Sequence, residues 1–382
     1  MNILFITKEF SHKSLNKTGG IGRFYSEISE ELVSKNHKVF VLGYNSIKFN
    51  STENGISVYF FKKINFNSSL ILLSFFVNRF LLIIHFLLFI NRNKNKIDVI
   101  EMDDPITSYF ISFFYKKIPK VIRQHGMPSI LSVMYGNKIN KFYYFFEKRA
   151  LIRCQGVIAV SSFAKDMTLS LYEVDIEVDI VYNGVSDINY FDVSKRKSTR
   201  ILLYVAALSE NKGYFNLVEV FNKIISMGVI ADLMVIGRQD EFQFEDLKFS
   251  EEAKSKVSYI GVLDYENLID YYEKSNLFLN FSHGETFGYT TVEAMSYRLP
   301  VIISNIGVAN EVVNTGINGY VIDENDLEEV VGCVEKILDD DQLQFDFGIK
   351  SADIVREKFS REQMAINTLR VYEKLIITES VK

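Results

Sequence analysis

The sequence predicts an α/β protein built from two doubly wound domains, and three observations support this class. Short apolar runs alternate with helical patterns along the chain, which favours parallel sheets covered on both faces. The runs form two series separated by a polar, charged stretch, Asp187–Thr199. The chain has 382 residues and is 48% hydrophobic, which is more than one ordinary domain needs. In such domains, ligands bind at the carboxyl ends of the strands.

Twelve apolar runs are predicted to be strands because each is short and bounded by turn residues. The first domain is expected to contain Ile3–Thr7, Lys38–Gly43, Val58–Phe61, Asp98–Met102, Lys120–Arg123 and Gly156–Val160. The second is expected to contain Ile201–Val205, Asp232–Ile236, Val257–Ile260, Leu277–Asn280, Pro300–Ser304 and Gly319–Val321. The first run lacks a cleavage-site pattern, so we predict a strand there and not a signal peptide.

A glycine-rich stretch, TGGIGR at 18–23, separates the first strand from a helical pattern over Phe24–Ser34. Glycines allow close approach of the backbone to a ligand, and the following helix N-terminus favours an anion. The stretch lacks the third glycine of a dinucleotide fingerprint. Gly20 is therefore a candidate phosphate contact, with a plain flexible loop as the alternative.

The segment 70–90 is apolar at 17 of 21 positions, which is long enough to span a bilayer. Asn78, Arg79 and His85 interrupt it, and an arginine inside a bilayer is costly. Three interpretations stay open: a helix covering the sheet, a covering helix that also enters a membrane interface, and a span. Basic residues at 92–96 and the aromatic-basic run KFYYFFEKR at 141–149 are compatible with the interfacial interpretation.

Charge is unevenly distributed. Residues 1–150 contain 21 Lys and Arg against 10 Asp and Glu (+11), and the remainder contains 22 against 38 (−16). The basic half is consistent with an anionic partner such as a membrane surface, or with ordinary solvated charge. It forms no tract typical of nucleic-acid binding. The two distant cysteines, Cys154 and Cys333, argue against a disulfide framework and fit a reducing, cytoplasmic compartment.

Two single residues follow predicted strands. His125, in RQHG, is expected at the carboxyl end of its strand, facing the ligand side, although an isolated histidine is often only structural. Lys212, followed by Gly213, opens a helical pattern after the strand Ile201–Val205. A lysine in that position can hold a phosphate, and a solvated surface lysine is the alternative.

The stretch HGETFGYTTVEAMS at 283–296 places Glu285 and Glu293 on either side of a Gly-Tyr-Thr-Thr segment. Thr290 and Glu293 have the spacing of a capping box, so Glu293 has a purely structural alternative. Free backbone N–H groups over 288–291 would attract phosphate, and carboxylates bind sugar hydroxyls well. The pattern therefore favours a sugar joined to a nucleotide through phosphates.

ETFGYTTVEAMSYRLPVI followed by NIGVANEVV resembles the nucleotide-binding region of the retaining glycosyltransferases of family four, which have the GT-B fold. The resemblance rests on Glu-x7-Glu, Glu-Ala-Met, Pro-Val and Gly-x-x-x-Glu, the last at Gly307 and Glu311. The GGIG stretch, His125-Gly126, IAVSSFAKD, VYNGV and Lys212-Gly213 follow the same order, so the resemblance covers nearly the whole chain.

The resemblance implies two Rossmann-like domains facing across a cleft. Residues 1–187 would bind the acceptor, 188–360 would bind the nucleotide sugar, and the helix in 361–382 would cross back to the first domain. The donor would be a nucleoside-diphosphate sugar, and the acceptor a saccharide, either lipid-linked or a surface polysaccharide. No cofactor and no metal would be needed. The enzyme would be cytoplasmic, with the inner face of the cell membrane as a further place of action. The richness of the sequence in Lys, Asn, Ile and Phe, and not the resemblance, suggests a bacterial source.

The resemblance also implies roles for matching residues. Glu285 would hold the donor sugar and His125 would lie beside the reaction centre. Glu293 would hold the ribose, and Lys212 would neutralise the diphosphate. The walls of the donor pocket would come from Phe287, Gly288, Tyr289 and Thr290, and the Gly20 stretch would close over phosphate or acceptor.

The chain departs from the family pattern at two places. Ala206-Ala207 replaces a Gly-Arg pair, so the arginine that accompanies Lys212 is absent, and Arg238 is a candidate substitute. Tyr297-Arg298 replaces a small residue and glycine before Leu-Pro. Two alternatives therefore stay open: an enzyme resembling nucleotide-sugar epimerases, and a catalytically silent nucleotide-binding homologue.

Overall fold

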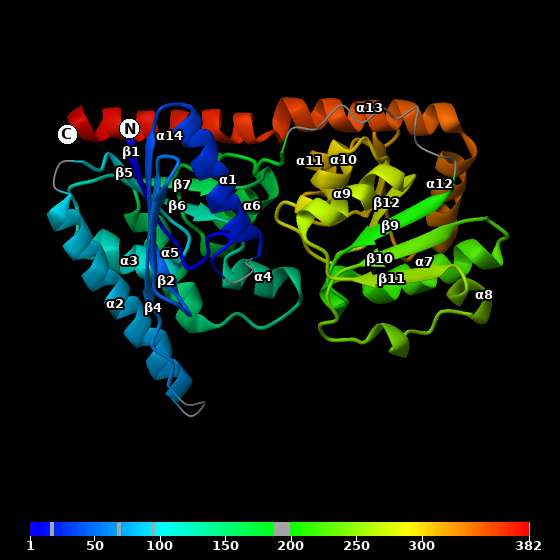
Figure 1. Ribbon diagram of the computed structural model, residues 1–382, viewed down its shortest axis with the longest axis horizontal. Coiled ribbons are helices and arrows are strands. Elements are labelled where there is room, and N and C mark those ends of the chain that lie inside the picture. The colour runs from blue at the N-terminus through cyan, green and yellow to red at the C-terminus, as the bar shows by residue number, and fades with distance from the viewer. Residues whose placement is uncertain (16–18, 67–69, 94–95, 187–198, 382) are drawn as a thin grey trace. The chain divides into compact units, whose positions relative to one another are not determined.

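The computed structural model describes residues 1–15, 19–66, 70–93, 96–186 and 199–381, and the chain divides into two compact units (Figure 1). Unit 1 is Met1–Gly184 with Arg361–Lys382, and unit 2 is Val185–Ser360. The sequence predicted the corresponding boundaries after residues 187 and 360. Of the predicted linker, Asp187–Thr199, only Thr199 lies within the described residues.

Unit 1 contains an eight-stranded sheet with the order β3-β4-β2-β1-β5-β6-β7-β8. The strands are β1 Asn2–Ile6, β2 Lys38–Asn45, β3 Phe49–Glu53, β4 Ile56–Lys62, β5 Val99–Met102, β6 Lys120–Gln124, β7 Gly156–Ala159 and β8 Asp179–Ile180. The helices are α1 Gly20–Ser34, α2 Ile71–Arg92, α3 Pro105–Phe114, α4 Pro128–Met134, α5 Lys141–Arg153, α6 Ser162–Tyr172 and α14 Arg361–Val381. All pairings are parallel except that of β3 with β4.

Strand β3 escaped the sequence prediction because its residues, FNSTE, lack an apolar run. A local turn signal was present. Asn54 and Gly55, with φ of 50° and 82°, connect Glu53 to Ile56 in the antiparallel register. Asn-Gly accepts positive φ at both positions of a two-residue hairpin turn, so this dipeptide alone identifies the hairpin.

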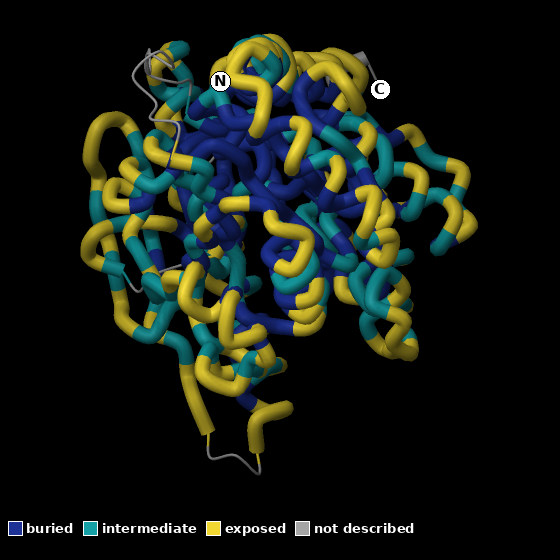
Figure 2. Tube along the Cα trace, turned by 90° about the vertical axis from the view of Figure 1, so that its right-hand side faces the viewer, coloured by how far each residue is buried: buried dark blue, intermediate teal, exposed yellow. Residues whose placement is uncertain are grey.

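The core of unit 1 joins the sheet to α1 and α14. Ile3 and Phe5 of β1 share one buried cluster with Phe24 of α1 and Tyr372 of α14. Figure 2 shows buried residues, in dark blue, gathered in the interior. The C-terminal helix is therefore part of the core of unit 1, although it follows unit 2 in the sequence.

A buried ion pair anchors α14 to this sheet. Arg123 on β6 donates to both carboxylate oxygens of Glu101 on β5, at 2.8 and 3.0 Å, and neither side chain is exposed. From α14, the Tyr372 hydroxyl donates to Glu101 at 2.6 Å and the Thr368 hydroxyl accepts from Arg123 at 2.9 Å. Such a pair tolerates burial better when further hydrogen bonds satisfy its groups, and α14 supplies one to each partner, while Nη1 of Arg123 has no hydrogen-bond partner among the described residues.

Unit 2 contains a fully parallel six-stranded sheet with the order β11-β10-β9-β12-β13-β14. The strands are β9 Ile201–Val205, β10 Asp232–Ile236, β11 Val257–Gly261, β12 Leu277–Asn280, β13 Val301–Ser304 and β14 Gly319–Ile322. The helices are α7 Tyr214–Ser226, α8 Glu251–Lys254, α9 Tyr265–Lys274, α10 Tyr289–Ser296, α11 Ala309–Val312, α12 Leu327–Asp339 and α13 Asp341–Lys358. All six strands lie where the sequence predicted them, within one residue at each end.

Several helix starts follow from local sequence. Asp104 accepts from the Thr107 N–H at the start of α3, where Pro105 is the first helical residue. Asp326 and Asp340 cap α12 and α13 in the same way. Side-chain caps satisfy N–H groups that the helix itself leaves free.

The apolar segment at 70–90 forms α2, which packs against β2 and α3. Among the described helices, α2 is the one long and apolar enough to cross a membrane by length and composition. Its contacts support the prediction of a covering helix. Only 28% of its most apolar window is buried, and eight of its large apolar side chains are exposed.

Candidate functional site

The topology of unit 2 identifies one position for a ligand. From β9 the chain proceeds outward through β10 and β11, and from β12 it proceeds in the opposite direction through β13 and β14. The carboxyl ends of β9 and β12 therefore flank the topological switch point, where open α/β sheets bind ligands. Lys212 follows β9, and Glu285 follows β12.

Lys212 is held at this point by a close approach of two chain segments. It ends the 3₁₀ helix Glu210–Lys212, and Gly213 turns the chain into α7 with a φ of 69°. A Cβ atom on Gly213 would lie 1.7 Å from the carbonyl oxygen of Phe281, so only glycine permits this packing. The Tyr204 hydroxyl donates to the Lys212 carbonyl at 2.7 Å.

Lys212 and Glu285 form an ion pair, with Nζ 2.5 Å from Oε1. The Ser282 hydroxyl donates to the same oxygen at 3.3 Å. The two charged side chains are 31% and 25% exposed, so both remain accessible to a ligand. A phosphate can take the ammonium group, and the carboxylate is then available to accept hydrogen bonds from hydroxyls.

The backbone of Glu285 is fixed from the neighbouring strand. Gly307, which follows β13, has a φ of 62°, and a Cβ atom there would lie 2.2 Å from the Glu285 carbonyl oxygen. The Val308 N–H donates to that oxygen at 3.3 Å. Gly307 thus positions Glu285 by close contact, which gives a physical reason for a glycine in the Gly-x-x-x-Glu motif.

A pocket of about 300 Å³, including its open mouth, lies beside Glu285. Polar groups come from Asn280, Ser282, Glu285 and Thr291, and the Asn280 amide donates to the Thr291 hydroxyl at 2.9 Å. The remaining wall is formed by Phe287, Gly288, Ile303, Ser304, Ile306, Val308, Ala309 and Val312. Sequence reasoning named Phe287 and Gly288 but missed Asn280, although it ends a correctly predicted strand.

The predicted capping box at Thr290 and Glu293 is wrong. Helix α10 begins at Tyr289 after Gly288, whose φ of 79° makes the turn, and no side chain caps it. Glu293 is the fifth helical residue and faces inward, where it is 2% exposed and accepts from the Tyr272 hydroxyl at 3.0 Å. Glu293 therefore does not form the predicted capping box of α10, and its contact with a ribose stays a prediction.

The remaining residues that were predicted to contact the donor are Phe287, Tyr289, Thr290 and Arg238. Phe287 packs between Tyr289 and Phe359, with ring centroids 5.0 and 5.9 Å apart. Tyr289 and Thr290 are half-buried at the start of α10. Arg238 is 68% exposed, and its guanidinium donates to Asp240 at 3.1 Å. The structure thus gives Arg238 a partner other than the one the sequence suggested, and its contact with a donor stays a prediction.

Gly20 and His125 belong to unit 1. Helix α1 begins at Gly20, with Gly19 as the N-cap, so the prediction that it begins at Phe24 is wrong: the glycines are accommodated in the first turn. His125 follows β6 and lies against Phe24 and Tyr25, with ring centroids 4.4 and 5.9 Å away. Burial, with Arg123 nearby, lowers the pKa of His125 well below its usual value. The imidazole is therefore neutral at neutral pH.

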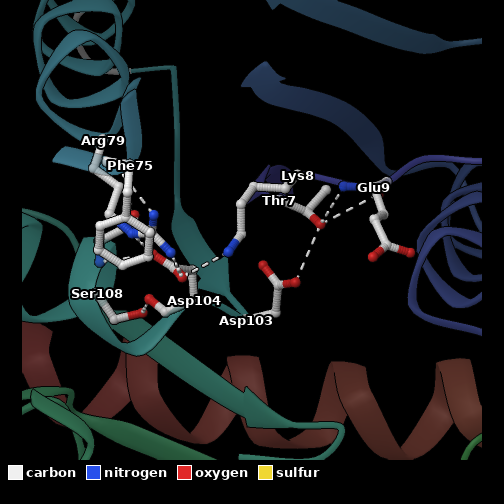
Figure 3. A network of polar contacts seen from close by, with 9 residues as sticks. Thr7, Lys8, Glu9, Phe75, Arg79, Asp103, Asp104 and Ser108 are labelled. Atoms are coloured by element: carbon white, nitrogen blue, oxygen red, sulfur yellow. Dashed lines mark hydrogen bonds and ion pairs between the residues drawn. The ribbon is translucent and has the colours of Figure 1, made fainter. Parts of the chain in front are cut away.

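Unit 1 has a charged cluster at its own switch point, between β1 and β5, which sequence reasoning missed (Figure 3). Lys8 donates to Asp104 at 2.8 Å, and Arg79 from α2 donates to both carboxylate oxygens of Asp104, at 3.1 and 2.8 Å. Thr7 donates to Asp103 at 3.3 Å. The available signal was the Asp-Asp pair directly after a predicted strand.

The two neighbouring carboxyls of this cluster titrate differently. Burial raises the pKa of Asp103 to about 7. Burial also acts on Asp104, but Lys8 and Arg79 outweigh it and lower the pKa of that carboxyl. Asp103 therefore changes its charge near neutral pH at the carboxyl edge of the sheet, where ligands of such sheets bind.

Among the described residues, no group of three or more His, Cys, Asp or Glu side chains is arranged to hold a metal ion. The metal-independence implied by the sequence stays a prediction.

Most of each unit matches a model of a known protein family. Residues 186–353 match the family model described as glycosyl transferases group 1. Residues 18–187 match the model described as glycosyltransferase family 4. The chain belongs to the family four glycosyltransferases. The resemblance predicted from the sequence motifs is thereby confirmed.

Relatives of this glycosyltransferase differ in how much of it they cover. An uncharacterized glycosyltransferase of Methanocaldococcus jannaschii is 24% identical and matches 98% of both chains. The O-antigen chain mannosyltransferase RfbU of Salmonella typhimurium is 29% identical over 47% of this chain and 50% of its own length. The capsular polysaccharide biosynthesis glycosyltransferase CapM of Staphylococcus aureus is 25% identical over 57% and 61%.

The glycosyltransferase shares its fold with solved structures. Sucrose-phosphate synthase from Thermosynechococcus elongatus has a TM-score of 0.79 at 17% identity, covering 99% of each chain. HepE from Anabaena, solved with UDP and glucose, has a TM-score of 0.69 at 17% identity, covering 97% of this chain and 99% of its own. The predicted GT-B fold with two Rossmann-like domains is confirmed.

Proposed function

We propose that this glycosyltransferase moves a sugar, with retention of configuration and without a metal ion, from a nucleoside-diphosphate sugar to a lipid-linked or surface-polysaccharide acceptor. The observation that carries the proposal is the Lys212–Glu285 ion pair at the switch point of unit 2. It combines a cation for the diphosphate with a carboxylate for sugar hydroxyls in one accessible place.

The pocket next to the pair supports a sugar as its occupant. Glu285, Ser282 and Asn280 contribute hydrogen-bond acceptors and donors to its wall, and Phe287 and Val308 contribute apolar surface. Sugar rings have hydroxyl edges and apolar faces, so this mixture suits them. The solved complex of HepE with UDP and glucose supports a nucleotide sugar as the donor.

In the proposed reaction, the bond between the anomeric carbon and the diphosphate oxygen breaks. A bond to the acceptor hydroxyl oxygen forms on the same face, and the acceptor proton passes to the departing diphosphate. Lys212 stabilises the charge that develops on the diphosphate, which is the usual role of fixed cations at leaving groups. Glu285 holds the sugar hydroxyls in position.

The acceptor class is supported by the relatives. CapM is named for capsular polysaccharide biosynthesis and RfbU for the O-antigen chain, both of which are surface polysaccharides. We place the enzyme in the cytoplasm, at the inner face of the membrane where lipid-linked acceptors are available.

A thermal-shift screen against UDP, GDP, ADP and CMP tests the donor half of the proposal. A nucleotide at 100 times its dissociation constant stabilises the protein by about 2.7 kcal/mol. Lys212→Met should abolish the shift. Lys223→Met is the matched control, because Lys223 is 33% exposed and also pairs with a carboxylate, at 3.7 Å. Equal shifts in both variants would contradict the phosphate role of Lys212.

Turnover of the donor that binds separates the competing functions. Transfer that depends on added acceptor supports the proposal. Conversion of the nucleotide sugar without acceptor would favour the epimerase-like alternative, and binding without any turnover would favour a silent homologue. The silent alternative is motivated by Ala207, where the family has an arginine.

A further inference from the structure

The first half of helix α2 buries polar residues and exposes apolar ones, whereas its second half buries Leu82, Phe86 and Ile90. A helix that covers a sheet normally buries its apolar stripe and exposes polar residues. In the first half of α2, the buried residues include Ser74, Asn78 and Arg79. Eight large apolar residues of α2 are exposed by 36 to 71%, namely Ile71, Leu72, Leu73, Phe76, Phe80, Ile84, Leu87 and Leu88.

Specific hydrogen bonds hold this orientation. The Asn78 side chain accepts from the Ile64 N–H at 2.8 Å and donates to the Ile64 carbonyl at 2.7 Å. The Ser74 hydroxyl accepts from the Phe66 N–H at 2.7 Å. Arg79 makes its two bonds to Asp104 at the carboxyl edge of the sheet (Figure 3). Rotating α2 to bury its exposed leucines would break all of these bonds, so the packing of the unit holds its outward apolar face in place.

The exposed surface continues from α2 onto α5 and α3. The ring of Phe76 lies 5.8 Å from that of Phe142 on α5, and Phe145 on α5 lies 6.4 Å from Tyr109 on α3. Exposed apolar residues on these two helices are Phe113, Phe114, Phe142, Phe145 and Ile152. We call the exposed apolar residues of α2, α3 and α5 the aromatic face. Contiguous patches of this kind mark interaction sites on soluble proteins.

The charge on the three helices has one sign at the surface. Glu147 is their only carboxylate, and it is buried, where it accepts from Ser129 and Tyr172. Basic groups accompany the aromatic residues: Lys116 and Lys117 are exposed directly after α3, and Arg149 lies 5.5 Å from the Phe145 ring. The surface is therefore both apolar and positive.

We propose that the aromatic face docks on a bilayer surface that contains anionic phospholipids. Apolar side chains enter the interfacial region while the flanking lysines and arginines contact the headgroups, which is how interfacial helices bind membranes. A second copy of the chain is a poorer occupant, because two positive faces would meet. Docking would bring the enzyme to the bilayer that holds a lipid-linked acceptor. In that respect alone the docking rests on the proposed function.

Sedimentation of the full-length protein with vesicles tests the docking. One set of vesicles contains phosphatidylcholine alone, and the other contains equal parts of phosphatidylcholine and phosphatidylglycerol. We expect binding to the second set that weakens with added salt. Lys116→Glu combined with Lys117→Glu should lower binding about fivefold or more for each charge. No donor or acceptor is present, so failure here is distinct from failure of the transferase proposal.

Matched substitutions test the apolar component. Leu72→Ser with Phe80→Ser should lower vesicle binding by about tenfold or more. Ile230→Ser with Ile377→Ser is the control, because Leu72 and Ile230 are both 71% exposed, and Phe80 and Ile377 are both 64% exposed. All four residues are exposed, so the variants should melt as the wild type does.

Three results would overturn the proposal. One is the absence of binding to anionic vesicles, and another is equal binding by the aromatic-face variant and its control. The third is a dimer in light scattering that only the Leu72 and Phe80 variant dissolves, with vesicle binding unchanged, which would make a second copy the occupant.

Discussion

The close approach at Gly213 yields a sharp prediction about the site. Gly213→Ala places a Cβ atom 1.7 Å from the Phe281 carbonyl oxygen and keeps a left-handed conformation, with φ of 69°. A non-glycine residue in that conformation costs about 1 to 2 kcal/mol. Forcing atoms into packed space costs about 1 to 3 kcal/mol more. We therefore expect a loss of about 2 to 5 kcal/mol in the free energy of unfolding.

Gly228→Ala is the matched control. Gly228 has a φ of 81°, and nothing lies within 4 Å of its added Cβ. Its free energy of unfolding should fall only by the cost of the left-handed conformation, about 1 to 2 kcal/mol. Urea unfolding of both variants, followed by nucleotide titration, separates the two effects. Gly213→Ala should also weaken nucleotide binding, because Lys212 precedes it and the Phe281 loop leads to Glu285. Equal stability and equal affinity in the two variants would refute the reasoning.

Three further predictions concern buried charged groups. Because the folded-state pKa of Asp103 is raised to about 7, the folded protein binds a proton that the unfolded chain releases above about pH 4, and stability should fall as pH rises between these values. Asp103→Asn should remove this slope in urea midpoints measured across that range, and an unchanged slope would count against the shift. Arg123→Met leaves the buried Glu101 carboxylate without its cation and should lower the free energy of unfolding by about 3 to 5 kcal/mol. Arg356→Met removes an arginine that is 58% exposed and should lower it by less than about 1 kcal/mol in the same assay. Glu293→Gln keeps an acceptor for Tyr272, so melting should change little while nucleotide affinity in calorimetry falls; unchanged affinity would argue against the ribose role.

The strands were predictable because a buried parallel strand is a continuous apolar run bounded by polar residues. Leu277–Asn280 and Ile201–Val205 illustrate this, since both strands match the sequence prediction at each end. Helix starts were less predictable where glycine makes the turn. Helix α10 begins at Tyr289 because Gly288, in a left-handed conformation, makes the turn in place of the expected cap, and α1 begins at Gly20 after an extended Gly19.

The sequence by itself determined the fold class, the two strand series and the motifs that place the chain in its family, since these are local patterns of polarity and spacing. Tertiary structure alone decided which charges meet. Lys212 and Glu285 lie 73 residues apart, and Lys8 and Asp104 lie 96 apart. Strand order brings each pair to a switch point, and strand order is not a local property. The orientation of α2 was decided in the same way, because Arg79 reaches Asp104 only once α2 packs beside β2 and α3.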